Sequence, residues 1–392
     1  MSEINEATQR QEASGDTGVK AGVQKTEGAK RLRQLDMARS QFATRVRQRW
    51  AALPRWVRVA TLLAFIAVLY GLPNLNIPFI RTESIAFSSV LFTCAVYVLV
   101  AVGLNVVIGL AGLLDLGYIG FFAVGAYSVA VFGSPQSEIA TEYPWLALIP
   151  IAIALSMVSG VILGMPTLRL RGDYLAIVTL GFGEIVRLIA VNSSITNGQQ
   201  GISQVPRPPG EIDGERIFGV VSARPYYWLA LTVVLICMLG VRQLENSRVG
   251  RAWLAIREDE DAAELMGVPA FRFKLWAFAI GAALGGLSGA LFASRQGYIN
   301  SNSFDLLLSI LFVAAVVLGG SGNMLGVTLG AILIAYLPEK LRDFSEDLPE
   351  YRFLAFGLAL VVIMIFRPQG LIPSRRRAVE LKDRQEEVTV GG

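Results

Sequence analysis

Long apolar runs separated by short polar connections fill the sequence from about residue 57 onward. A soluble domain has no use for repeated runs of this kind, whereas a bilayer core about 30 Å thick requires about 20 apolar residues per helical crossing. Backbone polar groups in lipid must be bonded within their own segment, and the runs lack the alternation of barrel strands. The chain is therefore predicted to be an all-α, polytopic membrane bundle with spans at 57–72, 84–104, 112–133, 145–164, 174–191, 226–241, 273–294, 306–320, 323–337 and 352–366.

Charge and composition divide the chain into three predicted regions. Charged residues make up only 17% of the sequence, against about 25% in soluble domains. Residues 1–50 are polar, basic and poor in aromatics, so we expect a disordered cytoplasmic tail. Residues 51–373 are the predicted transmembrane domain, and residues 374–392 are a predicted cytoplasmic C-terminal tail.

Arginine placement predicts the orientation of the spans. Clusters at 45–58 and 367–377 flank the first and last apolar runs, and basic residues favour the cytoplasmic side. Both termini are therefore expected in the cytoplasm, which requires an even number of spans, about ten. That parity favours two spans in 306–337, separated at Gly319–Asn323, although a re-entrant pair or a broken helix fits the same residues.

Several catalytic patterns are missing from the sequence. It contains no G-x-x-x-x-G-K-[ST] phosphate loop, no G-x-S-x-G, no HExxH and no histidine. Cys94 and Cys237 lie inside apolar runs, where free buried thiols are expected. We therefore predict no catalytic residue, no metal, no cofactor and no nucleic-acid partner, and the chain is not expected to be an enzyme.

The longest predicted cytoplasmic connection, 242–272, carries a candidate interaction element. Residues 249–266 are predicted to form one amphipathic helix, ended by Gly267 and Pro269. Its apolar stripe would comprise Val249, Ala252, Trp253, Ile256, Ala263 and Met266. Two interpretations remain open: this helix docks into a groove of a cytoplasmic partner, or it packs on the inner surface of its own bundle.

Three charged residues lie within the predicted spans. Asp115, near the start of 112–133, is expected close enough to the inner surface to be solvated. Glu184 and Arg187 share one helical face of 174–191. Because an unpaired charge in the bilayer is costly, they are interpreted either as a structural pair facing the bundle interior or as the lining of a polar pathway.

Small residues at four-residue spacing mark several spans. Gly281, Gly285 and Gly289 recur on one face of 273–294, and the pairs Gly160/Gly164 and Gly326/Gly330 repeat the interval. Such spacing lets helix backbones approach closely. We therefore predict a tightly packed bundle.

The sequence resembles the permease subunits of ABC importers for branched-chain amino acids, specifically the M-type subunit. The resemblance runs over about 84–373 and rests on several segments together: Gly103-Leu-Asn105, Gly109 to Gly117, Leu168 to Arg187, Ser247-Arg-Val-Gly250-Arg, Ala255 to Gly267, Val317 to Asn323 and Arg367-Pro-Gln-Gly370.

The resemblance implies a role for the 242–272 loop. Asp261-Ala-Ala-Glu264-Leu-Met-Gly267 fits the pattern of the coupling helix that sits in a groove of an ATPase subunit. The implied coupling residues are Arg248, Gly250, Arg251, Arg257, Glu258, Asp261, Ala262, Ala263 and Gly267.

The resemblance also implies partners and a substrate class. The chain would lie in the cell (plasma or inner) membrane with an H-type second permease, two cytoplasmic ATPase subunits that hydrolyse ATP, and an external binding protein. The cargo would be Leu, Ile and Val, with urea or short amides as the alternative. A secondary transporter that uses Glu184 and Asp115 as ion or proton sites is the rival from another class.

Overall fold

The computed structural model describes residues 54–75, 82, 86–139, 141–170, 172–212, 215–219 and 222–344, together with 354, 357, 358, 361 and 370–372. The chain divides into two compact units, one ending at Leu72 and the other beginning at Pro73. The first unit contributes α2, Arg55–Gly71. The predicted tails 1–50 and 374–392, and Arg171, lie outside the described residues.

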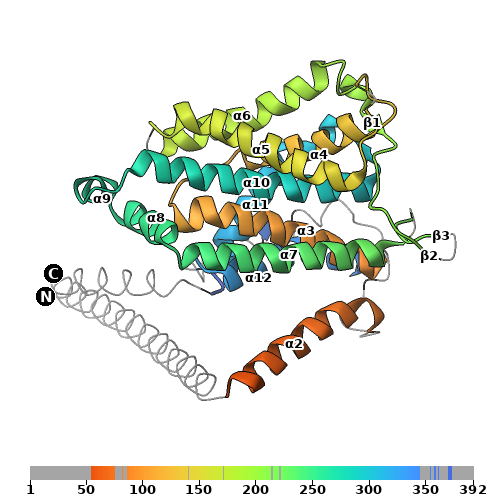
Figure 1. Cartoon of the computed structure of the whole chain (residues 1–392), viewed down its shortest axis with the longest axis horizontal. Coiled ribbons are helices and arrows are strands. Elements are labelled where there is room, and N and C mark those ends of the chain that lie inside the picture. The colour runs from red at the N-terminus through yellow and green to blue at the C-terminus, as the bar shows by residue number, and fades with distance from the viewer. Residues whose placement is uncertain are drawn as a thin grey trace, which may run out of the picture. The chain divides into compact units, whose positions relative to one another are not determined.

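The second unit is built from helices (Figure 1). In chain order they are α3 (Phe87–Leu104), the π-helix η2 (Asn105–Leu110), α4 (Tyr118–Gly133), α5 (Trp145–Thr167), α6 (Asp173–Asn192), α7 (Ala223–Glu245), α8 (Arg248–Glu258), α9 (Glu260–Leu265), α10 (Ala270–Gln296), α11 (Leu306–Gly319) and α12 (Met324–Phe344). Short 3₁₀ turns are η1 (Leu72–Asn74), at the junction of the units, η3 (Gly198–Gln200) and η4 (Ser301–Phe304).

Length and apolar composition agree with a multi-pass membrane protein. Within the described residues, 8 helical stretches are long and apolar enough to cross a membrane, and Tyr118–Gly133 is a shorter apolar helix. Each of the first nine predicted runs overlaps a helix, and 306–337 contains two helices, α11 and α12, rather than one. The tenth run, 352–366, lies largely outside the described residues, so the number of spans and the orientation of the termini stay predictions.

Helices α3, α4 and α10 form the centre of the bundle. Within an 18-residue apolar stretch, 78% of the residues in Phe87–Leu110 and 67% of those in α10 are buried, against 39% or less in the other candidate spans. Helix α10 packs against α3, α4 and α5, and α3 packs against α7 and α12 (Figure 1). The Tyr118 hydroxyl donates a 2.7 Å hydrogen bond to the carbonyl of Gly281, joining α4 to α10.

Close backbone approach at glycines explains this packing, and the prediction from glycine spacing is confirmed. A methyl group on Gly281 would lie 2.5 Å from Val107 Cγ2, and one on Gly160 would lie 2.6 Å from Ala282 Cβ. At Gly289 the same group would overlap the carbonyl oxygen of Phe122. These distances are shorter than a side chain tolerates. The helices can therefore lie this close together only because these positions are glycines.

The prediction that 112–133 is one continuous span is wrong. Helix α4 begins only at Tyr118, and residues 112–117 have no regular structure. Gly112 has a φ of +73°, a left-handed conformation that ends the preceding helix. Between residues 105 and 133 the chain therefore forms a π-helix (η2), an irregular segment and a new helix (α4).

At the C-terminal end of α10, two short strands, β1 (Ile202–Ser203) and β4 (Tyr298–Ile299), pair and form a clasp. Strand β1 pairs antiparallel with β4, with Ile202 opposite Ile299. The Ser134 hydroxyl donates to the carbonyl of Ser203, which ties the end of α4 to the same strands. In the connection between α6 and α7, a short hairpin joins β2 (Glu211–Ile212) to β3 (Glu215–Arg216).

Substituting Gly289 by Ala tests the packing of α10. The added methyl group should force α10 away from α4 and lower the free energy of unfolding by about 1–3 kcal/mol. Gly240 on α7 is the matched control, because a side chain there meets no atom within 4 Å. A thermal unfolding scan in detergent should show a lower Tm for Gly289→Ala and an unchanged or higher Tm for Gly240→Ala.

Candidate functional site

Two short helices replace the predicted single helix 249–266. Helix α8 ends at Glu258, and Asp259 is extended, with φ −156° and ψ 112°. The Asp259 side chain accepts a 3.0 Å hydrogen bond from the Ala262 N–H and caps α9. Since this cap satisfies an otherwise unpaired N–H group, Asp259 starts a new helix instead of continuing the old one.

The two helices divide the predicted apolar stripe between them. Trp253, Ile256 and Ala263 are buried, where Ile256 and Ala263 pack with Ala270 at the start of α10. These three side chains therefore pack within the chain itself. Met266 departs from the prediction, because it is 84% exposed beside Leu265, which is 89% exposed.

The ends of this element are fixed by short-range contacts. The Ser247 hydroxyl caps α8 by accepting from the N–H groups of Val249 and Gly250. Gly250 lies so close to the carbonyl of Leu244 that a methyl group would lie 2.5 Å from it. Gly267 ends α9 with a φ of +85°. Arg248, Arg251, Glu258, Asp261 and Ala262 lie on the exposed surface of the element.

Two contacts tie the element to α10. The Trp253 Nε1–H donates a 2.6 Å hydrogen bond to the carbonyl of Phe273. The Glu260 carboxylate lies 2.5 Å from Nζ of Lys274, which is itself buried. A buried lysine needs such a partner, so the first turn of α9 and the first turns of α10 are held together.

Asp115 is buried, contrary to the expectation that it is solvated. Its side chain is 0% exposed and its Oδ1 accepts a 2.9 Å hydrogen bond from the Gly117 N–H. The neighbouring Leu116 N–H donates to Thr179 Oγ1, and the Leu116 carbonyl accepts from the Ser309 hydroxyl. The irregular segment 112–117 is therefore stable inside the bundle because α6 and α11 supply its backbone partners.

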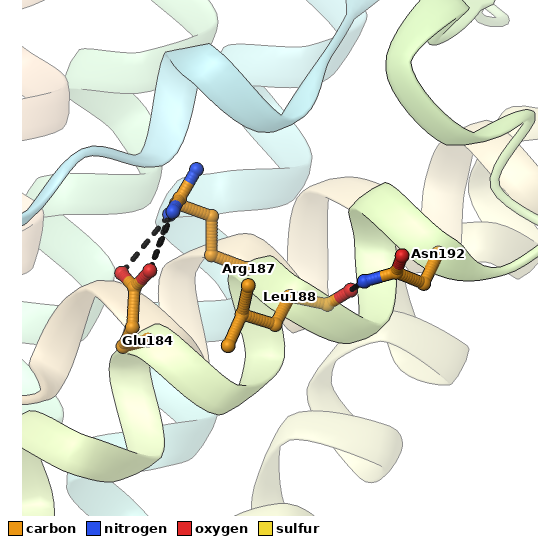
Figure 2. Close-up of polar contacts among 4 residues, drawn as sticks. All are labelled: Glu184, Arg187, Leu188 and Asn192. Atoms are coloured by element: carbon orange, nitrogen blue, oxygen red, sulfur yellow. Dashed lines mark hydrogen bonds and ion pairs between the residues drawn. The ribbon is translucent and has the colours of Figure 1, made fainter.

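Glu184 and Arg187 form the predicted pair on α6. Arg187 Nε lies 3.0 and 2.9 Å from the two carboxylate oxygens of Glu184, and Figure 2 shows the guanidinium turned back along the helix toward the carboxylate. The pair does not face a sealed interior, because 40% of the Glu184 side chain and 28% of the Arg187 side chain are exposed. Asp115 bonds to Gly117 instead, so the three charged residues do not form one cluster among the described contacts.

Several residues that hold these segments in place were not predicted. Thr179 and Ser309 act through Leu116, 63 and 193 positions away in the sequence, and Lys274 pairs with a residue of the preceding helix, so no local pattern marks them. Asn105 is another, since its Oδ1 accepts a 2.8 Å hydrogen bond from the Gly322 N–H. Thr179 and Asn105 stand within the segments that carried the family resemblance, which was the one available signal.

A family model for the branched-chain amino acid transport system permease component matches residues 86–365. The chain belongs to this permease family. The match includes every segment described above from α3 to α12, so the α8–α9 element, the irregular segment 112–117 and the Glu184–Arg187 pair all lie within the family domain.

Curated relatives agree with the family. The chain is 42% identical over 309 residues to the high-affinity branched-chain amino acid transport system permease protein LivM of Salmonella typhimurium, covering 74% of this chain and 71% of that protein. Identity to LivM of Escherichia coli is 42% over 307 residues, with 74% and 70% covered. The LivH permease protein of Salmonella typhimurium is 22% identical over 70% of this chain and 91% of its own length. No solved structure matches the chain.

Replacing Thr179 by Val tests how the permease holds segment 112–117. The Leu116 N–H would lose its acceptor inside the bundle, which should lower the free energy of unfolding by about 1–3 kcal/mol. Thr179→Ser keeps the hydroxyl and should unfold near the wild-type Tm. Thr93→Val is a matched control, because the Thr93 hydroxyl bonds only the Ser89 carbonyl of its own helix in the described contacts. Equal Tm values for Thr179→Val and Thr93→Val would contradict the assignment.

Proposed function

We propose that this chain is one transmembrane subunit of an ATP-driven importer of branched-chain amino acids. It pairs with a related second permease, two cytoplasmic ATPase chains and an external binding protein. Supporting this, the family model covers most of the chain, and relatives at 42% identity are high-affinity branched-chain amino acid permeases. Urea or a short amide is the alternative cargo of the same machinery.

The exposed tip of α9 is the observation that carries the proposal. Leu265 and Met266 project from a helix whose other exposed side chains include Asp261 and Glu264. Apolar side chains this exposed gain about 1.5–3 kcal/mol each when buried. The complementary surface is a groove on an ATPase subunit. This groove would accept the two apolar side chains and offer basic groups to Asp261 and Glu264.

Such a subunit transports by alternating access, and the ATPase chains outside the bundle drive the change of conformation. Closure of the ATPase pair displaces α9, and the contacts of α8–α9 with α10 carry the displacement into the spans. The glycine contacts let the central helices shift as packed units between two arrangements. ATP is hydrolysed on the partner chains in this scheme.

A secondary transporter is the second candidate, and Asp115 favours it. Its Oδ2 is buried and has no hydrogen-bond partner among the described residues, and a buried carboxyl of this kind suits a proton site. Under that alternative the chain works alone, and an ion gradient replaces ATP.

Gentle purification of the tagged chain from its native membranes separates the two candidates. We expect an ATPase chain with a phosphate loop and a second related permease to co-purify, and the complex to accumulate leucine in vesicles only with ATP. Recovery of the chain alone, with leucine uptake driven by an ion gradient, would overturn the importer proposal.

The double variant Leu265→Asp/Met266→Asp tests the docking surface in the same preparation. Two new carboxylates on an acidic tip should remove most of the buried apolar contact and reduce the recovered ATPase chain at least about tenfold. The second permease should still co-purify. Ile195→Asp is the control. Ile195 is also exposed, but it follows the C-terminal end of α6 and lies outside the α8–α9 element.

We propose further that the open face of α6 lines the substrate pathway at the boundary with the second permease. Ile177, Ile185 and Ile189 are exposed on this helix together with the Glu184–Arg187 pair. Exposing a charged side chain to lipid near the middle of a span costs about 2.5–3.5 kcal/mol. A protein partner or a polar pathway removes that cost and leaves the ion pair accessible to a polar substrate.

Single and double substitutions of the pair test this role. Glu184→Gln and Arg187→Gln should each reduce leucine uptake at least about tenfold, while the complex still assembles and hydrolyses ATP. If the pair is only structural, the double variant Glu184→Gln/Arg187→Gln leaves no unpaired charge and recovers uptake; if it lines the pathway, uptake stays low. Asn192→Ala, which removes a bond to the Leu188 carbonyl on the same helix (Figure 2), is the control.

A further inference from the structure

Arg257, on the last turn of α8, connects the α8–α9 element to a second central helix. Its Nη1 donates a hydrogen bond to the carbonyl of Gly109, 148 positions away in the sequence. Gly109 belongs to the π-helix η2, which continues α3 without interruption. The contacts through Trp253 and Glu260 lead to α10, whereas Arg257 leads to the C-terminal end of α3.

The Gly109 carbonyl can accept this bond because the helix ends there. The last four carbonyls of a helix have no following turn to bond them, and η2 ends at Leu110. The Leu113 N–H bonds back to Val107 rather than to Gly109. A cation at a helix C-terminus is also favoured by the helix dipole, so the guanidinium caps the α3–η2 helix from another element.

Gly112 makes room for the Arg257 side chain. A methyl group on Gly112 would lie 2.7 Å from Arg257 Cγ and 3.1 Å from Arg257 Cβ. The left-handed φ of +73° at Gly112 turns the chain around the arginine stem. The turn that follows η2 therefore packs against the aliphatic stem of the arginine.

Segment 105–112 also contacts the turn between α11 and α12. Asn105, the first residue of η2, accepts from the Gly322 N–H. A methyl group on Gly109 would lie 2.6 Å from the same Gly322 nitrogen. Beyond it, the N–H groups of Leu371 and Ile372 donate to carbonyls at the end of α11. Segment 105–112 thus lies between α8 on one side and the 320–322 turn on the other.

We propose that Arg257 is the positioning residue that couples displacement of α8 to the C-terminal end of α3 and, through segment 105–112, to the turn between α11 and α12. The inference rests on the proposed importer function. Under this proposal the movement of α8 reaches α3 through the Arg257 cap, and not only α10 through Trp253 and Glu260.

The experiment compares Arg257→Gln and Arg257→Lys in the complete complex, reconstituted in vesicles. ATP hydrolysis and leucine uptake are measured on the same sample, and leucine transported per ATP is the readout. Arg257→Gln loses the charge and most of the donors, so the ratio should fall about tenfold, within the range of known coupling energies. Arg257→Lys keeps the charge and should recover part of the ratio. Arg242→Gln, an exposed arginine at the end of α7, is the control.

The outcomes separate this inference from the importer proposal. Wild-type vesicles without ATP-dependent leucine uptake contradict the importer proposal itself. If wild type transports, an unchanged ratio in Arg257→Gln overturns the inference. Loss of the ATPase chain or of assembly in both Arg257→Gln and Arg257→Lys also overturns it, because Arg257 would then be a residue of stability rather than of coupling.

Discussion

Hydrogen bonding of the backbone where helices are interrupted is the constraint on which this bundle depends. Lipid offers no partner for a free N–H or carbonyl group, so a break inside a span survives only where protein atoms replace the lost bonds. Thr179 and Ser309 do this for segment 112–117, and Asn105 does it for the 320–322 turn. Each replacement comes from another helix, so each break also fixes the position of a neighbouring element.

This arrangement explains why the charged and polar residues are spread over the bundle. Asp115 serves the turn into α4 through the Gly117 N–H, and Lys274 serves the junction of α9 and α10 through Glu260. Glu184 and Arg187 differ from both, because they bond to each other and remain partly exposed. Asp115 and Lys274 hold junctions between helices inside the chain, whereas the Glu184–Arg187 pair is partly open at its surface.

Sequence patterns located the helices because a bilayer imposes a length and an apolar composition on every span. The same patterns placed the start of a span at residue 112 instead of 118, since nothing local indicates that Thr179 and Ser309 lie next to Leu116. The break at Asp259 left a local signal, an Asp followed by Glu260 and Asp261, which suits a helix start. Helical spacing of apolar residues on both sides concealed it. Exposure of Met266 followed from that break, because α9 does not continue the axis of α8.

The clasp between β1 and β4 has a mechanical consequence for α10. Its C-terminal end is joined to the connection after α6 and, through Ser134, to the end of α4, whereas its first turns carry the contacts with α8–α9. A helix of 27 residues is about 40 Å long. Pivoting by about 5° around the clasped end therefore moves the first turn by about 3.5 Å. Anchored by the strand pair at one end, the long helix would convert a small rotation there into a displacement of atomic size at the other end.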